Sequence, residues 1–181
     1  MNIFSKFGNQ KIWVRLIVSI SFMTIASWAV MILWTAHVSE EAAIEQAQEF
    51  ARSAHDMVLA GLTGMMVTGT IPQREVFIDQ IKQLPSIREV RVLRGEAVTR
   101  QFGPGIGQES EHDALEGNVL ATGREYSAVE STANGEDALR VIRPALAHEN
   151  YLGKNCMTCH AVPLGTVLGA VSMKVSLKST R

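Results

Sequence analysis

The chain has 181 residues, with 17 Lys and Arg against 18 Asp and Glu, and 46% of its residues are hydrophobic. The basic residues are scattered and form no patch, which argues against a nucleic-acid-binding protein. The sequence also shows no internal repeat and no low-complexity tract.

An apolar segment near the N-terminus is long enough to cross a membrane. Residues 16–36 contain no charged side chain, and a helix of this length spans roughly 30 Å, about one hydrocarbon core. Trp13 and Trp34 lie at its two ends, as interfacial aromatic residues do. Lys6, Lys11 and Arg15 precede it, and Glu40, Glu41, Glu45 and Glu49 follow it. The positive-inside rule therefore predicts a cytoplasmic tail at 1–12, a transmembrane anchor at 13–36 and a periplasmic domain at 37–181.

A cleaved signal peptide is the alternative interpretation of this segment. Its apolar region would be shorter and would end in a cleavage site of small residues, which Trp34-Thr35-Ala36 matches poorly. The sequence favours an uncleaved single-pass anchor in the inner membrane. No acidic residue and three basic ones precede His37, so residues 37–181 have 14 basic and 18 acidic side chains, a net charge of −4. That length suits one soluble domain.

Two helices are expected to begin the exported domain. Residues 39–69 are rich in Ala, Glu, Gln and Met, with Ser39 as the expected N-cap and Gly69 and Pro72 as the stop. Residues 73–84 predict a second helix with Val76, Phe77, Ile81 and Leu84 facing inward.

After residue 84 the apolar residues recur at every second position, which predicts strands. We expect strand 87–94, a turn at Gly95-Glu96 and a hairpin partner at 97–102. A short helix follows at 110–121, with Ser110 as its cap and Gly123 as its stop. Strands 126–130 and 138–145 flank a turn at Asn134-Gly135, and strand 167–177 alternates apolar with polar residues. The predicted fold class is α+β: a transmembrane helix continues into a long helix, followed by an antiparallel sheet with helices on one face.

The most specific motif is Cys156-Met157-Thr158-Cys159-His160. Cys-x-x-Cys-His is the attachment sequence of a c-type haem. Cys156 and Cys159 can each add to one vinyl group of the same porphyrin, and His160 can then ligate the iron. We therefore predict one covalent haem c, held outside the cytoplasm where thioether bonds are made.

Other interpretations of these residues explain less. A disulfide between the two cysteines gives no reason for His160. A tetrahedral zinc site needs four ligands, and no further Cys or His pair completes one. A thioredoxin-like pair usually lies where a strand enters a helix, which the neighbouring Gly153 and Pro163 do not suggest.

The exported domain resembles the periplasmic c-type-haem PAS-like sensor domains of bacterial chemoreceptors and related membrane signalling proteins. The resemblance covers nearly all of residues 37–178. It rests on the haem motif and on five further stretches: Met66-Val67-Thr68-Gly69, residues 87–95, Gln101-Phe102-Gly103-Pro104-Gly105, Val119-Leu120-Ala121-Thr122-Gly123 and residues 165–172. The resemblance implies a PAS-like sheet, a homodimer through the long helix, and an iron with His on one side and Met or water on the other. The long helix can be exchanged in such dimers, so the Met can come from the partner. Those receptors continue into a second span and a cytoplasmic module, whereas this sequence stops at Arg181.

Met66 is the first choice as the sixth iron ligand, because it adjoins the Val-Thr-Gly stretch at the end of the long helix, and Met65 is the second. Both could instead be ordinary core residues. His55 could form a bis-His site, but we expect it at the surface or at an interface. Haem propionates need donors, and four cations are candidates: Arg100, Arg140, Arg143 and Lys154.

Two functions remain open. The first is a sensor of redox state or of a diatomic gas, in which a change at the iron shifts the long helix. The second is a monohaem cytochrome that exchanges electrons with a membrane-associated oxidoreductase, a task that His/Met ligation also suits. An enzyme such as a peroxidase would need a distal acid–base group near an open iron, and no residue is placed for that, so we do not expect an enzyme.

Overall fold

The computed structural model describes residues 11–107, 109–131 and 136–177, and its chain forms two compact units, Met1–Ala42 and Ala43–Arg181. Helix α1 (Ile12–Thr68) is long and apolar enough in its first part to cross a membrane. It ends at Thr68, as expected. The predicted cap at Ser39 is wrong, because α1 passes through Ser39 without a break. Neither Gly nor Pro occurs between Ile12 and Ala60, so nothing in the sequence interrupts the helix there.

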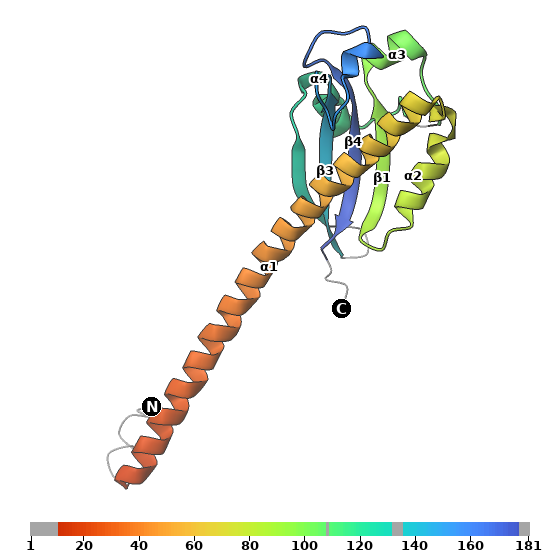
Figure 1. Cartoon of the computed structure of the whole chain (residues 1–181). Helices are drawn as coiled ribbons and strands as arrows, with labels where there is room; N and C mark the ends of the chain where they lie inside the picture. The colour runs from red at the N-terminus through yellow and green to blue at the C-terminus, as the bar shows by residue number, and fades with distance from the viewer. Residues whose placement is uncertain (1–10, 108, 132–135, 178–181) are drawn as a thin grey trace. The chain divides into compact units, whose positions relative to one another are not determined.

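The second unit is an antiparallel sheet with helices on both of its faces. Its strands are β1 (Ile87–Arg94), β2 (Tyr126–Ser131), β3 (Asp137–Leu146) and β4 (Val167–Ser176), in the order β1-β4-β3-β2. The helices of this unit are the second part of α1, η2 (Ile71–Gln73), α2 (Arg74–Lys82), α3 (Glu96–Phe102), α4 (Ala114–Thr122) and η3 (Cys156–Thr158). The predicted α+β class is thus confirmed (Figure 1).

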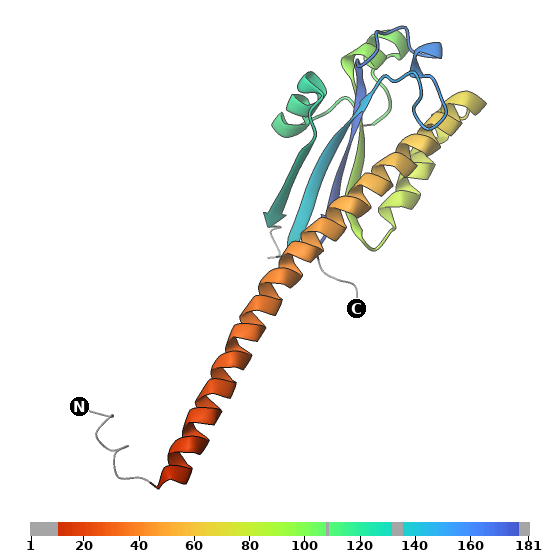
Figure 2. The ribbon, with the colours of Figure 1, turned by 60° about the vertical axis from the view of Figure 1, so that its left-hand side comes forward.

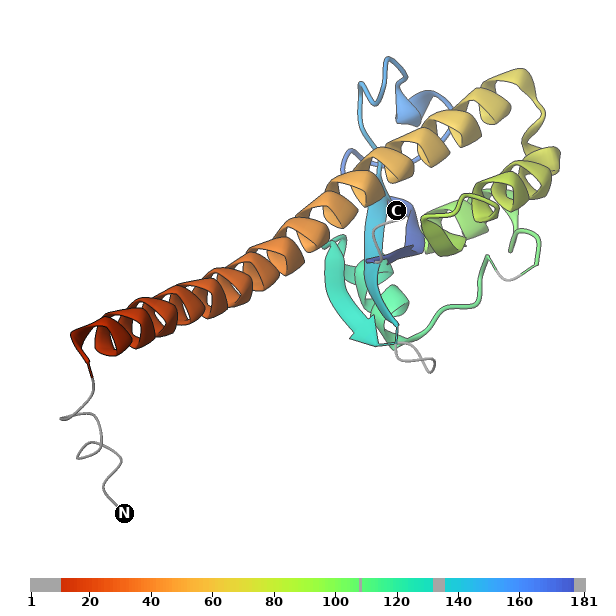
Figure 3. The same cartoon turned by 90° about the horizontal axis from the view of Figure 1, so that it is seen from below.

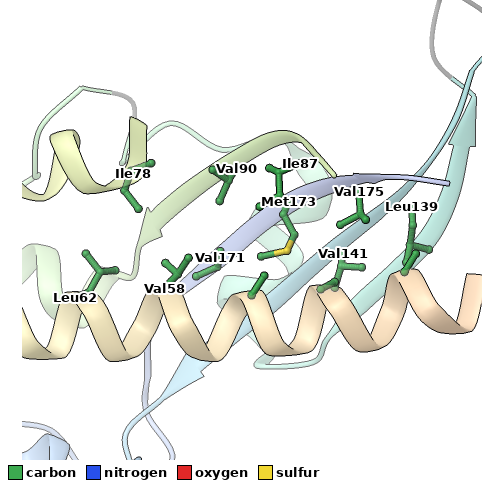
Figure 4. Close-up of a cluster of buried hydrophobic side chains, with 13 residues drawn as sticks. Val58, Leu62, Ile78, Ile87, Val90, Leu139, Val141, Val171, Met173 and Val175 are labelled. Carbon is green, nitrogen blue, oxygen red and sulfur yellow. The ribbon is translucent and has the colours of Figure 1, made fainter. Parts of the chain in front are cut away.

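The main core lies between α1, α2 and one face of the sheet. Ala51, Val58 and Leu62 of α1 are buried against Val141 of β3 and Val171 of β4. Figure 4 shows Val58, Leu62, Val141 and Val171 between the helix and the strands. At the end of α1 the chain turns and returns as α2, as Figure 3 shows. Within α2, Ile78 is buried, but Val76 is 65% exposed, and Leu84, two residues past the end of the helix, is 42% exposed. These two side chains do not face inward as predicted.

Helix α4 covers the opposite face of the sheet, which corrects the prediction of helices on one face only (Figure 2). Val119 of α4 packs with Leu93, Ile142 and Ala170 of three strands. The helix starts later than predicted, because Asp113 and not Ser110 is its cap. The Asp113 carboxylate accepts the amides of Leu115 and Glu116, and the Glu116 side chain accepts the Asp113 amide. Gly123 ends α4 in the left-handed conformation, as expected.

The predicted hairpin 97–102 is wrong, because these residues form helix α3. Strand β1 pairs with β4 instead, with Arg94 opposite Gly169. Six residues are too few for their periodicity to distinguish a strand from a helix. The two remaining strand predictions around Asn134-Gly135 are confirmed within a residue or two, although the turn itself lies outside the described residues. The alternation of apolar and polar residues in 167–177 is typical of a half-buried strand, but β4 is central and buried on both faces, with Ser172 only 5% exposed.

Candidate functional site

The Cys-x-x-Cys-His motif lies in the loop that connects β3 to β4. Backbone hydrogen bonds close the neck of this loop. The Ala147 amide donates to the Thr166 carbonyl at 2.9 Å, and the Gly165 amide donates to the Ala147 carbonyl at 2.8 Å. Deeper in the loop, the Cys156 amide donates to the His148 carbonyl at 2.9 Å. The two central strands therefore hold the base of the motif.

One short turn, η3, brings the motif residues together. The Asn155 side chain caps it by accepting the Met157 amide at 2.9 Å. The His160 amide donates to the Cys156 carbonyl at 3.0 Å, which closes the turn. Both cysteines are free; Cys156 is half-buried and Cys159 is exposed. Cys156, Cys159 and His160 all line one cavity of about 480 Å³, within the usual range for ligand pockets.

Helix α3 holds the motif from its other side, near η3 in Figure 1. The Gln101 amide nitrogen donates to the Cys159 carbonyl at 3.0 Å, and its oxygen accepts the Ala161 amide at 3.2 Å. The Phe102 ring meets the His160 ring edge-on, with centroids 5.4 Å apart. The sequence prediction missed this role, because a strand at 97–102 would not have directed Gln101 at the motif. The Gln-Phe pair of the family resemblance was the available signal.

The second part of α1 forms another wall of the cavity. His55, Leu59, Leu62 and Met66 recur at intervals of three or four residues, so they lie along one face of the helix, and all four line the cavity. Met66 is 42% exposed. Met65 is not among the lining residues. The structure therefore separates the two candidate ligands and leaves Met66 at the site.

His160 is suited to bind a ligand through its ring. The residue is only 7% exposed, and its Nδ1 atom is buried without a hydrogen-bond partner. Burial lowers the pKa of this imidazole, and the nearby charge of Arg94 lowers it further. A neutral imidazole is the form that can donate an electron pair to a metal.

His55 was predicted at the surface or at an interface, and that prediction is wrong. The residue is 3% exposed, and its Nδ1 atom is buried without a partner. Burial, followed by the charge of Arg143, lowers its pKa to about 4, against an opposing effect of Asp56. The periodic stripe from His55 to Met66 was the sequence signal that could have placed it on the inner face of α1.

A side-chain hydrogen bond joins α1 to the motif loop. The Tyr151 hydroxyl donates to the Asp56 carboxylate at 2.9 Å. Burial and the bond to Asp56 raise the pKa of Tyr151 well above its ordinary value. The Tyr151 ring also stacks on His148, with centroids 6.3 Å apart, and both residues line the cavity. The helix and the loop are therefore tied directly to each other beside the cavity.

An ion cluster borders the cavity near the end of α1. Glu109 accepts Nε of Arg74 at 2.5 Å and Nε of Arg94 at 3.2 Å. Burial alone would raise the pKa of Glu109, but Arg74 and then Arg94 hold it below its ordinary value. These paired charges close that side of the cavity.

The four cations predicted as propionate donors divide into two pairs. Arg143 and Lys154 line the cavity. Arg140 does not, because it lies on the α4 side and bonds Asp113. Arg100 is directed at Glu96 and also does not line it. Nη1 of Arg143 is buried and has no hydrogen-bond partner, while its Nε donates to Glu125 at 3.0 Å.

These residues fit a c-type haem. The cavity has two free thiols, two buried imidazoles with unpartnered nitrogens (His160 and His55), apolar walls from α1 and the strands, and cations for carboxylates. Within the described ranges, no group of three or more His, Cys, Asp or Glu side chains could hold a bare metal ion. The imidazole of His160, directly after Cys159, suits a metal that arrives with its own porphyrin ligands.

Comparison of the chain with protein-family models, with curated proteins and with solved structures found no match.

Proposed function

We propose that this protein is a membrane-anchored, periplasm-facing sensor that binds one covalent haem c and responds to redox state or to a diatomic gas. The observation that supports this most is the single cavity lined by Cys156, Cys159 and His160 on one side and by helix α1 on the other. Iron in the haem supplies the redox chemistry or the gas coordination. The antiparallel sheet with its long N-terminal helix is in keeping with a PAS-like domain.

The motif residues have distinct roles in this proposal. The Cys156 and Cys159 thiols would hold the haem covalently, each adding its S–H across one vinyl group, with hydrogen going to one carbon and sulfur to the other. His160 would ligate the iron. Gln101 and Asn155 hold the turn that orients these three residues. Met66 is the proposed sixth ligand, since it lines the cavity and Met65 does not.

Helix α1 is the element that would transmit the response. It supplies Met66 to the cavity, it is tied to the motif loop through Asp56 and Tyr151, and the same helix contains the apolar segment. Loss of a Met66–iron bond would free the end of α1 and alter its position or its packing in a homodimer. Positive residues before the span and acidic residues after it support the proposed orientation.

The absorption spectrum of the detergent-purified protein, oxidised and reduced, with and without CO, tests the proposal. We expect covalent haem that resists acid–organic extraction, and none in Cys156→Ser/Cys159→Ser. Met66→Leu should leave a five-coordinate ferrous haem, whereas the matched control Met65→Leu should keep the parent spectrum. A protein without covalent haem would contradict the whole proposal. An unchanged spectrum in Met66→Leu would remove Met66 as a ligand.

Surface exposure around the motif favours a second candidate, an electron-transferring monohaem cytochrome. Cys159 is exposed, and the large apolar side chains of Phe102, Leu152 and Leu164 are 55%, 59% and 60% exposed. Exposed apolar residues beside a redox group can form a docking surface for a protein partner. A ferrous haem that ignores CO but exchanges electrons rapidly with a membrane oxidoreductase would favour this function over gas sensing.

A further inference from the structure

Apart from His160, two residues on the wall of the cavity have a buried side-chain nitrogen without a hydrogen-bond partner. Nδ1 of His55, on α1, and Nη1 of Arg143, on β3, are both buried and unpartnered. His55 is 3% exposed, and the Arg143 side chain is 25% exposed. Both residues line the cavity, and they are close enough for the Arg143 charge to disfavour a charged His55. Burying such groups without a hydrogen-bond partner destabilises a fold.

The acidic groups nearby are already engaged by other donors. Glu125 accepts Nε of Arg143 at 3.0 Å, and Asp56 accepts the Tyr151 hydroxyl at 2.9 Å. Glu109 is held by Arg74 and Arg94. The two unpartnered nitrogens therefore belong to cavity-lining residues, and no described carboxylate bonds them.

We propose that His55 and Arg143 form a carboxylate-binding pair, and that this pair receives a propionate of the haem. The inference rests on the proposed function for the identity of the carboxylate. The guanidinium of Arg143 is a charged donor, and the N–H of a neutral His55 imidazole is an uncharged one. Together they can donate to the two oxygens of one carboxylate group. A small free carboxylate offers the same chemistry and is the other source to distinguish.

This pair gives α1 a second connection to the haem, independent of Met66. His55 lies eleven residues before Met66 on the same helix face, so the two contacts would be about three turns apart. The helix would then respond both to the iron ligand and to the charge of the propionate. Arg143 would connect the same group to the central strand β3.

Resonance Raman spectra of the holoprotein test the pair through the propionate bending band. We expect His55→Leu and Arg143→Leu each to shift this band in the same direction, with the double variant shifting it no further than the larger single change. The iron coordination bands should stay unchanged. His55→Gln and Arg143→Lys retain a donor and should return the band toward its parent position. Arg88→Leu removes the same charge from the exposed far end of β1 and serves as the control.

The outcomes separate the possible sources and errors. A five-coordinate iron in His55→Leu would overturn the inference, because His55 would then be an iron ligand. An unmoved propionate band in both Leu variants would show that the pair does not bind a haem propionate. Calorimetry with succinate then decides the remaining question. Succinate binding to the parent protein that is lost in Arg143→Leu would assign the pair to a free carboxylate, and no succinate binding would overturn the inference. Absence of covalent haem in the parent protein would contradict the proposed function instead, and the succinate titration would then test the pair by itself.

Discussion

Buried polar side chains occur on both faces of the sheet, but the two faces differ in how many of their polar atoms have a hydrogen-bond partner. On the α4 face, Glu116 is 1% exposed and pairs with Arg91 at 3.0 Å and with Arg140 at 3.5 Å. On the α1 face, single nitrogen atoms of His55, Arg143 and His160 are buried without a partner. Nε of Arg140 is unpartnered too, yet the terminal nitrogens of that guanidinium reach carboxylates.

The difference separates two uses of buried polarity. The carboxylates and guanidinium groups of the α4 cluster satisfy one another and fix a helix to the sheet. On the α1 face, Nε of Arg143 reaches Glu125, but Nη1 of Arg143 and Nδ1 of His55 and His160 have no partner within the described part of the chain. All three residues border the one cavity that the cysteines also line. Buried polar atoms without partners are rare in folded proteins, so a cluster of them beside a cavity indicates a ligand site.

The largest effect is expected from Glu116→Ala, which removes the centre of the α4 cluster. The substitution leaves two arginines without their shared carboxylate and also breaks the capping box of α4. We expect the free energy of unfolding to fall by about 3–5 kcal/mol. Urea titration followed by far-ultraviolet circular dichroism measures this, because all three tryptophans lie in the apolar part of α1. Glu89→Ala, which removes an exposed pair with Lys174, should cost only about 0–1 kcal/mol.

The next prediction concerns His55 on the α1 face, where a substitution should raise the free energy of unfolding. In the haem-free Cys156→Ser/Cys159→Ser background, His55→Leu replaces an unsatisfied buried imidazole with an apolar side chain. We expect stabilisation of about 1–3 kcal/mol there, because the desolvation cost of the unpartnered nitrogen disappears. In the holoprotein the same change should destabilise the fold, since the proposed carboxylate contact is lost. Destabilisation in both backgrounds would show that His55 has a purely structural role.

Sequence patterns predicted the elements that local chemistry determines. Uninterrupted helix formers predicted α1, and alternation predicted the strands β1, β2, β3 and β4. Long segments contain several periods, so their signal survives tertiary context. The short segment 97–102 has too few residues for that, and its helical state follows from β1 pairing with β4, a contact between the two ends of the domain.

The sequence named some residues that line the cavity, the contiguous motif together with Met66, Arg143 and Lys154, but not the pairing of His55 with Arg143. Cys156, Cys159 and His160 lie close together in sequence, and all three line the cavity. His55 and Arg143 are 88 residues apart, and no local pattern connects a helix residue with a strand residue over that distance. Their relation arises from packing α1 across β3, and it became visible only with the three-dimensional arrangement.

A smaller effect is expected from Gln101→Ala, which removes both side-chain bonds between α3 and the motif loop. Each such bond contributes about 0.5–1.5 kcal/mol, and the loop is held at its base by the strands, so the domain should still fold. Hydrogen exchange at the Ala161 amide should accelerate by roughly tenfold. Arg100→Ala, on the exposed side of the same helix, should leave that exchange unchanged.

The smallest expected effect is on the pH dependence of stability in the acid range. Arg74 and Arg94 hold the pKa of Glu109 below its ordinary value of 4.5, despite burial that alone would raise it. A carboxyl with a depressed folded-state pKa adds stability that is fully present above its unfolded pKa and is lost as pH falls through the folded one. The parent protein should therefore lose stability below about pH 4.5, and Glu109→Gln should flatten this part of the curve while lowering stability at neutral pH.

Asp113 on the α4 face also has a lowered pKa, against burial, through its helix-capping bonds and Arg140. Asp113→Asn should flatten the same pH range independently of Glu109→Gln, because the two ion clusters lie on opposite faces and share no residue; non-additive curves would show that the faces are coupled.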